Sequence, residues 1–449
     1  MILPRELNLR TLKWQIGKMG RKKHSRQLQC YMNDNKVGIL TFKQNQLSFQ
    51  YDKNWLTLLV RRPLSLSLPL QAQAHKGDTV YSYFENLLPD NDSVRKQIVD
   101  RLGAYSRHPF DLLRVVGADC IGAIRLIDED DPVKSSDKDY ERLNESEVAE
   151  LLRQTASGET MGMQADDEFR ISLAGAQEKT ALTLIDNQWY RPHGKLPTTH
   201  ILKLPIYTNN QFGPDLTNSV ENEWFHLELF RNLGLKTAEC SILQFEDIKV
   251  LSVERFDRKR HKDTFYRVPQ EDLCQALGFV SGSKYEDKGG PGIAPIMELL
   301  SNSLTPIVDR ETFMKTLVCS WLIAATDAHA KNFSIYLKPD GFQLTPTYDV
   351  LSVYPYFGQG SIQSKKIKMA MAMIGKNRHY IWDDIQRRHF ISTARHVKFS
   401  VDRMVEIIED IKKNFPDALN KTIESSPYRF PEDIIKMTSK FALKKLKQL

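Results

Sequence analysis

The segment at residues 325–334, ATDAHAKNFS, places four polar residues of different chemistry directly after an apolar stretch. Asp327 and Asn332 lie five positions apart in it. The catalytic loop of protein kinases has the same spacing between the aspartate that receives the substrate hydroxyl proton and an asparagine that binds magnesium. His329 has no second histidine or cysteine at helical spacing, so a zinc site is not expected. The pattern favours phosphoryl transfer, although this spacing also occurs by chance.

A further oxygen ligand is expected in the chain that follows this loop. Residues 333–337 favour a strand, residues 339–341 favour a turn, and the chain then returns to Asp349. A hairpin of this length brings Asp349 beside Asn332. A carboxylate and an amide oxygen suit Mg²⁺, which prefers hard oxygen ligands.

A lysine in the middle of a predicted strand is the candidate for contact with phosphate groups. Lys203 stands between Leu202 and Leu204 and points to the opposite face from both. Kinases pair such a strand lysine with a helix glutamate. Glu223, with Glu221 behind it, lies in the next predicted helix. The alternative is a solvated lysine on an edge strand.

Two further segments are candidates for nucleotide contact. The loop at 172–179, SLAGAQEK, contains small residues that let backbone N–H groups approach phosphate oxygens. It matches neither GxGxxG nor the Walker A pattern, so an ordinary tight turn is the alternative. The segment at 253–257, VERFD, lies where a connector between lobes offers its backbone to adenine, with Phe256 against the ring. A buried strand end is the alternative there.

The elements that must position these residues change character along the chain. Before about residue 275 strands are favoured, among them a hairpin at 28–42 and an alternating apolar and polar strand at 63–69. Afterwards helices dominate, with starts expected at Asp309 and Ser400. This order, a β-rich half before a helical half, is found in two-lobed kinases.

Composition limits the class of protein. The chain has 449 residues, 41% of them apolar, and a formal charge of +7. Residues 1–26 hold eight Lys and Arg and one acid, which leaves 55 basic and 55 acidic residues in the rest. The excess therefore lies in a basic arm, for which three interpretations stay open: contact with phosphates, disorder, and an upstream start codon. Five scattered cysteines without CxxC spacing suit a reducing cytosol, and neither a signal peptide nor a membrane span is expected.

From about residue 28 onward, the chain resembles the HipA family of bacterial toxin serine/threonine kinases. The stretches that carry the resemblance are PLSLSLPL (63–70), YFENLLPD (83–90), FRISLAGAQEKTAL (169–182), PTTHILKLP (197–205), VERFDR (253–258), PQEDLCQ (269–275), GGPGIAPIM (289–297), TDAHAKNFS (326–334) and LTPTYD (344–349). The arm at 1–26 has no counterpart in the family pattern.

The resemblance implies an ATP- and Mg²⁺-dependent enzyme. It implies that Asp327 is the catalytic base, that Asn332 and Asp349 bind Mg²⁺, and that Ser172 is autophosphorylated, which silences the kinase. Phosphate at Ser172 would add negative charge beside a loop that holds ATP phosphates. The implied nucleotide contacts are Ala174, Gly175, Ala176, Gln177, Glu178, Lys179, Lys203, Glu254, Arg255, Phe256, His329, Ala330, Lys331, Asn332 and Asp349.

The expected fold is α+β, a two-lobed protein-kinase-like fold in which a β-rich N-terminal lobe with an extra N-terminal subdomain precedes a mostly helical C-terminal lobe. We expect the basic arm at 1–26, the N-terminal subdomain at 27–160, the nucleotide-binding part of the N-lobe at 161–275 and the helical C-lobe with the catalytic loop at 276–449.

The resemblance also implies partners. HipA proteins act with HipB, a helix-turn-helix antitoxin, and the complex binds operator DNA and represses its operon. Their kinase activity on a protein target, of which glutamyl-tRNA synthetase is the known type, leads to starvation signalling and drug-tolerant persistence. In this chain, Lys376 and Arg378 of a basic loop are candidate DNA contacts, with a solvated loop as the alternative. Two other functions stay open: a small-molecule phosphotransferase, and a catalytically idle DNA-bound corepressor.

Overall fold

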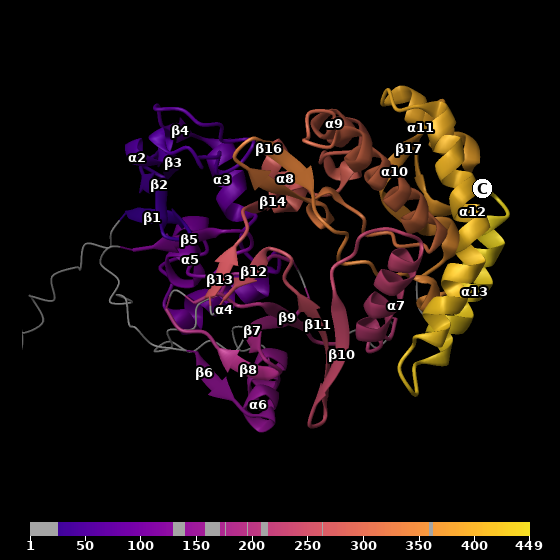
Figure 1. Cartoon of the computed structure of the whole chain (residues 1–449), viewed down its shortest axis with the longest axis horizontal. Coiled ribbons are helices and arrows are strands. Elements are labelled where there is room, and N and C mark those ends of the chain that lie inside the picture. Colours follow the sequence, from indigo (N-terminus) through magenta and orange to yellow (C-terminus); the bar gives the residue numbers. More distant parts are fainter. Residues whose placement is uncertain are drawn as a thin grey trace, which may run out of the picture.

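The computed structural model describes most of the chain, and its helices and strands form the expected α+β fold. In Figure 1 the elements run from the N-terminal sheet at one side to the helices α12 and α13 at the other. The basic arm, up to residue 25, and Ala176 of the predicted phosphate loop lie outside the described residues. The described ranges are 26–128, 140–157, 171–175, 177–194, 196–207, 214–262, 264–358 and 362–449.

The N-terminal subdomain is a five-stranded antiparallel sheet packed against short helices. The predicted hairpin is present as β1 and β2, and Asn33 turns it with a φ of 51°. The strands lie in the order β4-β3-β2-β1-β5. Their bounds are β1 Gln27–Met32, β2 Asn35–Lys43, β3 Gln46–Tyr51, β4 His75–Lys76 and β5 Ile124–Ile127, and the helices are α2 Lys53–Thr57, α3 Asp78–Glu85, α4 Asp92–Leu102 and α5 Pro109–Val116.

The strand predicted at 63–69 is wrong. The segment forms a tight turn, closed by a single bridge between Ser65 and Leu68. Prolines at both ends cannot donate to a ladder, and the polar groups between them bond to another segment instead. Leu66 N donates to Glu271 Oε1 at 2.8 Å, and the Ser67 hydroxyl donates to the Gln275 carbonyl at 2.8 Å. Contacts with residues about two hundred positions away therefore decide the local conformation.

A second sheet carries the predicted phosphate-binding lysine. Its order is β10-β11-β9-β7-β8-β6, so Lys203, at the end of β9, lies on an inner strand. This excludes the edge-strand alternative. Helix α7 follows and packs on β10 and β11. The bounds are β6 Glu141–Leu143, α6 Glu145–Ala156, β7 Lys179–Ile185, β8 Gln188–Arg191, β9 His200–Lys203, α7 Ser219–Asn232, β10 Cys240–Phe245 and β11 Ile248–Glu254.

A small sheet, β14-β15-β16, joins the end of the β-rich half to the hairpin that follows the catalytic loop. Strand β14 pairs with β15, so that Asp272 lies opposite Ser334. The expected return hairpin is present, because β15 also pairs with β16 in the antiparallel direction. The bounds are β12 Arg258–His261, β13 Thr264–Arg267, β14 Gln270–Asp272, α8 Leu273–Leu277, β15 Ser334–Lys338 and β16 Gly341–Leu344.

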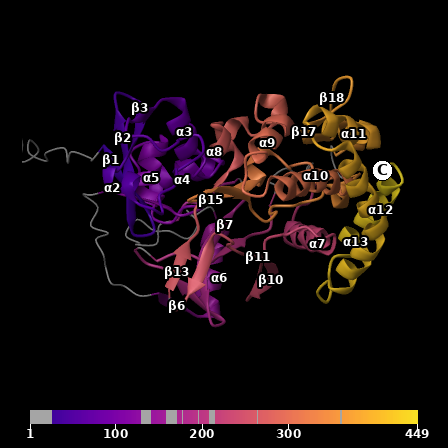
Figure 2. The same cartoon turned by 45° about the horizontal axis from the view of Figure 1, so that its top comes forward.

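The helical half surrounds α10, which leads to the catalytic loop. This helix begins at Pro306, not at Asp309 as predicted, because proline is favoured at the first helical position. The predicted cap of α12 is confirmed, since the Ser400 hydroxyl accepts from Arg403 N. Figures 1 and 2 show α12 and α13 at the outer edge, near the C-terminus. The bounds are α9 Ile293–Leu300, α10 Pro306–Leu322, β17 Lys368–Ile374, β18 Arg378–Ile381, α11 Arg387–His396, α12 Val401–Glu424 and α13 Glu432–Leu446.

Two hydrophobic cores underlie the halves. One combines the N-terminal subdomain with side chains of the second sheet, among them Leu182 and Leu202. The other combines α7 with the helical half, with Phe230 and Trp321 in its interior. The site lies between residues anchored in both cores. Among the described residues, no helix is long and apolar enough to cross a membrane.

Candidate active site

A cavity of about 270 Å³ gathers most of the predicted site residues. Glu178 is exposed and Ala330 is fully buried, and neither is among the residues that line it. The predicted residues that do line it come from both halves of the chain: Ala174, Gly175, Gln177, Lys179, Lys203, Glu254, Arg255, Phe256, Asp327, His329, Lys331, Asn332 and Asp349.

The predicted catalytic loop is closed by its own asparagine. Asn332 Nδ2 donates to the Asp327 backbone carbonyl at 2.8 Å, and Asn332 N donates to the His329 carbonyl at 2.9 Å. The Asp327 side chain stays 58% exposed and is therefore accessible to a substrate. Asp327, Asn332 and Asp349 line the cavity together, so the oxygen donors expected for Mg²⁺ meet at one place.

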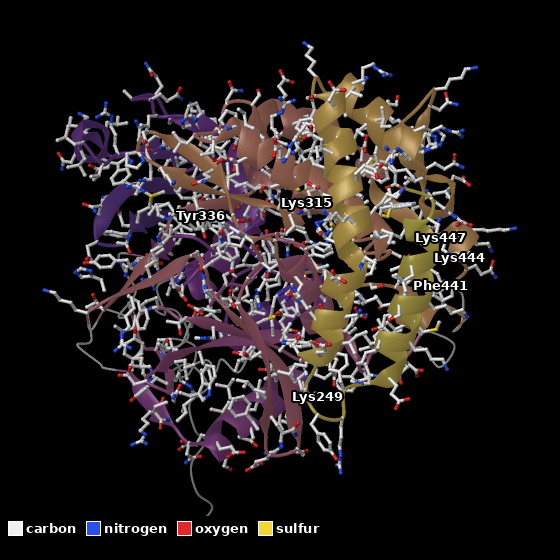
Figure 3. All side chains as sticks on the ribbon, turned by 45° about the vertical axis from the view of Figure 1, so that its right-hand side comes forward. Lys249, Lys315, Tyr336, Phe441, Lys444 and Lys447 are labelled. Carbon is white, nitrogen blue, oxygen red and sulfur yellow. The ribbon has the colours of Figure 1, made fainter. Side chains whose placement is uncertain are left out.

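Lys203 joins the two halves through two carboxylates. Its Nζ donates to Glu223 Oε1 at 2.7 Å and to Asp349 Oδ1 at 2.9 Å. The predicted partner Glu223 is confirmed, whereas Glu221 pairs with Lys249, which is labelled in Figure 3. Burial alone would lower the pKa of Lys203, but Asp349 and Glu223 raise it above its ordinary value. The lysine is therefore held charged and fixed in position.

Four lysines line the cavity, and three of them are paired with carboxylates there: Lys203, Lys284 and Lys331, with Lys179 as the fourth. Burial, and then the positive charge of Lys203, lower the pKa of Lys179 to about 8. Gly175 has a φ of +103°, and a Cβ there would lie 2.5 Å from Lys179 Nζ. The positive φ favours glycine at this position, and a Cβ there would push the end of the Lys179 side chain away from the loop. The donor set fits ATP, with Asn332 and Asp349 as the residues that would hold its magnesium.

Asp90, from the N-terminal subdomain, is a site residue that the sequence prediction missed. Lys331 Nζ donates to its Oδ1, and Lys284 Nζ donates to its Oδ2 at 2.9 Å. Asp90 N also donates to the Gly175 carbonyl at 3.1 Å. Burial alone would raise the pKa of Asp90, but Lys331 and Lys284 lower it to about 2. Asp90 closes the quoted stretch YFENLLPD, but no local signal indicates that it reaches the catalytic loop.

The predicted phosphorylation site is buried. Ser172 is 0% exposed, and its hydroxyl donates to the Leu87 carbonyl at 2.7 Å. Its backbone N–H donates to the Asp119 carbonyl at 3.0 Å. The hydroxyl is thus directed into the N-terminal subdomain, and it reaches a phosphoryl donor only if this loop leaves its place.

His329 is a loop residue in a buried environment. It is 2% exposed, and burial lowers its pKa, so it is neutral at pH 7. Its Nε2 lies 3.7 Å from Asp327 Oδ2, beyond a good hydrogen bond. The described part of the chain contains no group of three or more His, Cys, Asp or Glu residues arranged to hold a metal ion.

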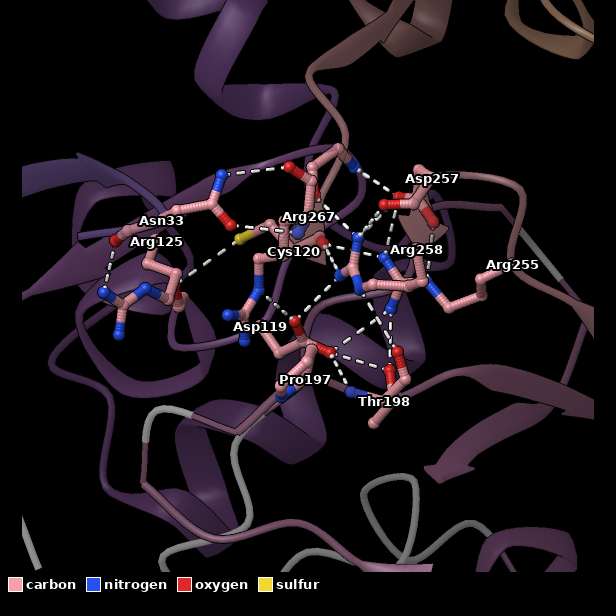
Figure 4. A network of polar contacts seen from close by, with 12 residues as sticks. Asn33, Asp119, Cys120, Arg125, Pro197, Thr198, Arg255, Asp257, Arg258 and Arg267 are labelled. Carbon is pink, nitrogen blue, oxygen red and sulfur yellow. Dashed lines mark hydrogen bonds and ion pairs between the residues drawn. The ribbon is translucent and has the colours of Figure 1, made fainter. Parts of the chain in front are cut away.

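Residues 254–256 of the connector at the end of β11 line the cavity, and the Arg255 side chain is bound in a buried network. Arg255 donates to Asp257 Oδ1 at 3.0 Å and to the Thr198 hydroxyl at 2.7 Å. Figure 4 shows that Arg255, Arg258 and Arg267 surround Asp119. Arg258 Nη2 and Arg267 Nε donate to Asp119 Oδ1 at 2.8 and 2.9 Å. This buried network fixes the connector to the N-terminal subdomain.

The candidate DNA contacts lie away from the cavity. Lys376 is exposed in the turn between β17 and β18. The Arg378 side chain is 65% exposed, and its Nη1 lies 3.2 Å from Glu286 Oε1. Both side chains are therefore accessible to an anionic partner.

Comparison with known proteins gives a consistent result over both halves. Residues 28–127 match the HipA N-terminal domain, and residues 171–419 match the HipA-like C-terminal domain. The chain is 34% identical over 318 residues to the putative kinase Y4mE of Sinorhizobium fredii, covering 70% of this chain and 74% of the relative. It is 28% identical over 345 residues to the serine/threonine-protein kinase toxin HipA of Shewanella oneidensis, covering 73% and 76%.

A solved structure has the same fold. It is the Shewanella oneidensis toxin–antitoxin complex of HipA, HipB and operator DNA, matched with a TM-score of 0.77 and 24% identity over 94% of this chain and 96% of that chain.

Proposed function

Because the chain belongs to the HipA family and is a serine/threonine-protein kinase, we propose that it is the toxin of a toxin–antitoxin pair that phosphorylates a protein with Mg²⁺-bound ATP. The observation that carries the proposal is the meeting of Asp327, Asn332, Asp349 and Lys203 around one cavity. These groups come from two halves of the fold and match the parts that phosphoryl transfer needs.

The chain's own residues divide the chemistry between them. Asp327 is exposed, and it receives the proton of the serine or threonine hydroxyl as that oxygen attacks. Lys203 and Lys179 orient the phosphate groups, while Asn332 and Asp349 hold the metal. When bound, Mg²⁺–ATP supplies the phosphoryl group and the metal offsets the charge that develops on it.

The test is transfer of labelled phosphate from ATP with Mg²⁺, read by mass spectrometry of the products. Replacing Asp327 with Asn should lower the rate by about 10²–10⁴-fold. Asp340→Asn, an exposed aspartate in the β15–β16 turn, is the matched control and should keep the wild-type rate. Equal labelling by wild type and Asp327→Asn would remove Asp327 from the mechanism.

For the acceptor, we propose an aminoacyl-tRNA synthetase, with glutamyl-tRNA synthetase as the first choice, as the family resemblance implies. Purified synthetases and a panel of hydroxylated metabolites are offered to the same kinase preparation. Label in one synthetase and none in the metabolites supports a protein target. The reverse result would support a small-molecule phosphotransferase.

We propose HipB as the partner and operator DNA as the ligand of the complex, since the solved relative is such an assembly. Lys376 and Arg378, and the basic arm at 1–26, are the candidate phosphate contacts. Each lost phosphate contact should reduce the magnitude of the slope of log affinity against log salt concentration by about 1. An unchanged slope after replacing both residues with Ala, or after deleting residues 1–26, removes that segment from DNA binding. Operator binding without any phosphate transfer by wild type would support the corepressor function.

A further inference from the structure

Tyr285 contacts the proposed catalytic base from a loop that the mechanism above does not use. Its hydroxyl donates to Asp327 Oδ1 at 2.5 Å. Its ring packs edge-on against His329, with centroids 5.0 Å apart and an interplanar angle of 82°. The tyrosine comes from the segment between α8 and α9 and lies 42 positions before Asp327. It therefore reaches the catalytic loop from a separate part of the helical half.

Because of this contact, the two carboxylate oxygens of Asp327 differ in their hydrogen bonding. Oδ1 accepts from Tyr285, while Oδ2 lies 3.7 Å from His329 Nε2 and is not hydrogen-bonded to it. The terminal torsion of an aspartate is broad, so an exposed carboxylate turns easily. A donor fixed on Oδ1 stops this rotation. Oδ2 is then the oxygen that is held ready to accept the proton of a substrate hydroxyl.

The residues on both sides of Tyr285 are anchored, which is what a positioning residue requires. Lys284 pairs with Asp90 of the N-terminal subdomain at 2.9 Å. On the other side, Glu286 Oε2 accepts from Ala372 N of β17 at 2.7 Å. Tyr285 is thus held between two parts of the fold, and its hydroxyl has little freedom to leave Asp327.

The stretch GGPG at 289–292 makes this loop sterically feasible. Gly290 N donates to the Tyr285 carbonyl at 3.0 Å, and a Cβ on Gly290 would lie 1.8 Å from the Ser283 carbonyl oxygen. A Cβ on Gly292 would lie 2.3 Å from Glu286 Cδ. Gly290 therefore allows the chain to fold back against the backbone of the segment that carries Tyr285, and a side chain there displaces this segment, whereas a Cβ on Gly292 would move the Glu286 side chain.

We propose that Tyr285 is a positioning residue for Asp327, and that the turn at 289–292 holds it in place. The inference rests on the proposed function, because it assigns Tyr285 a role only if Asp327 is the base. It extends that function by adding a residue that is not among those lining the cavity and that acts through the Asp327 carboxylate.

The first test is Tyr285→Phe, which removes the hydroxyl and keeps the ring against His329. We expect kcat to fall about 10-fold, the usual effect of losing one hydrogen bond to a charged group, with KM for ATP unchanged. Tyr266→Phe, at a 51% exposed position on β13, is the control and should match wild type. A wild-type kcat for Tyr285→Phe, or a rise in KM for ATP with kcat unchanged, would overturn the proposal.

A second pair of variants tests the turn. Gly290→Ala should lower kcat because the new Cβ meets the Ser283 carbonyl, whereas Gly282→Ala should not, because a Cβ there has nothing within 4 Å. If the turn acts through Tyr285, the double variant Gly290→Ala/Tyr285→Phe loses no more activity than the stronger single variant. If the two losses of activity multiply in the double variant, or if Gly290→Ala has the wild-type kcat, the proposed role of the turn is contradicted.

Asp327→Asn is assayed beside these variants to separate the two levels of inference. If Asp327→Asn keeps activity, the proposed function fails and the positioning role fails with it. If Asp327→Asn is inactive while Tyr285→Phe has the wild-type kcat, the catalytic assignment stands and the positioning role alone is overturned.

Discussion

Lys203 Nζ lies 2.9 Å from Asp349 Oδ1, although the two residues are 146 positions apart in the chain. Lys203 ends an inner strand of the second sheet, whereas Asp349 follows the β15–β16 hairpin. Burial alone would raise the pKa of Asp349, but Lys203 and Lys179 lower it to about 2. The pair is therefore charged at neutral pH and connects the two halves of the fold where phosphoryl transfer is proposed.

Lys179 should make nucleotide binding depend on pH. Its pKa is lowered to about 8 by burial and by Lys203, and a lysine carries its charge only below its pKa. ATP affinity, measured by calorimetric titration, should therefore fall as the pH rises from about 7 to about 9. Lys179→Met should bind roughly 10-fold more weakly at pH 7 and lose this pH dependence. A wild-type affinity that stays flat over the range would show that Lys179 does not contact the phosphates.

Asp90 should contribute to stability as well as to the site. Asp90→Asn leaves Lys331 and Lys284 without their shared carboxylate and should lower the free energy of unfolding by about 2 kcal/mol. The pKa of Asp90 is depressed, so this contribution is present above the ordinary aspartate pKa and is lost as the pH falls toward about 2. Urea unfolding at neutral and acid pH measures it. Asp92→Asn, whose side chain is 76% exposed, is the control, and equal effects of the two variants would contradict the prediction.

The network around Asp119 should be the most sensitive point of the N-terminal subdomain. Asp119→Asn leaves three buried arginines short of a carboxylate, which should cost about 4 kcal/mol. The midpoint of urea unfolding reports the loss. Asp100→Asn breaks an ion pair whose side chains are 53% and 69% exposed and should change stability by less than about 0.5 kcal/mol. Similar midpoints for both variants would mean that the network stabilises little.

Charge at Ser172 should weaken nucleotide binding through displacement of its loop. In Ser172→Asp a carboxylate oxygen would face the Leu87 carbonyl, acceptor against acceptor, at a fully buried position. ATP affinity should fall at least about 10-fold, since Gly175 and Lys179 follow in the same loop. Ser172→Ala loses one hydrogen bond and should bind ATP as wild type does. The idea fails if Ser172→Asp binds ATP with unchanged affinity.

The sequence was informative where the site depends on local spacing. The five-residue interval between Asp327 and Asn332 and the length of the hairpin before Asp349 are visible in one segment. The alternation around Lys203 predicted its strand, and Glu223 was expected in the helix that follows. Each of these residues belongs to a local pattern of a few positions, so the pattern could be recognised without the fold.

The contacts that the sequence did not reveal join distant segments. Asp90 meets Lys331 across 241 positions, and Tyr285 meets Asp327 across 42. Neither has a local pattern that distinguishes it from a solvated aspartate or a core tyrosine. The alternation at 63–69 predicted a strand. The contacts that bend this segment into a turn come from Glu271 and Gln275, which the local pattern does not include. Tertiary packing, not propensity, decided these cases.

The arginine network around the connector also bears on inhibitor design. Gly122 N donates to Asp257 Oδ2 at 2.7 Å, and Ile121 lines the cavity itself. The outer side of the connector is therefore covered by the N-terminal subdomain and closed to solvent there. An ATP-competitive compound with a substituent that extends past the connector would collide with residues 119–122. If the cavity holds ATP as proposed, a compact compound that stays on the cavity side of residues 119–122 avoids this collision.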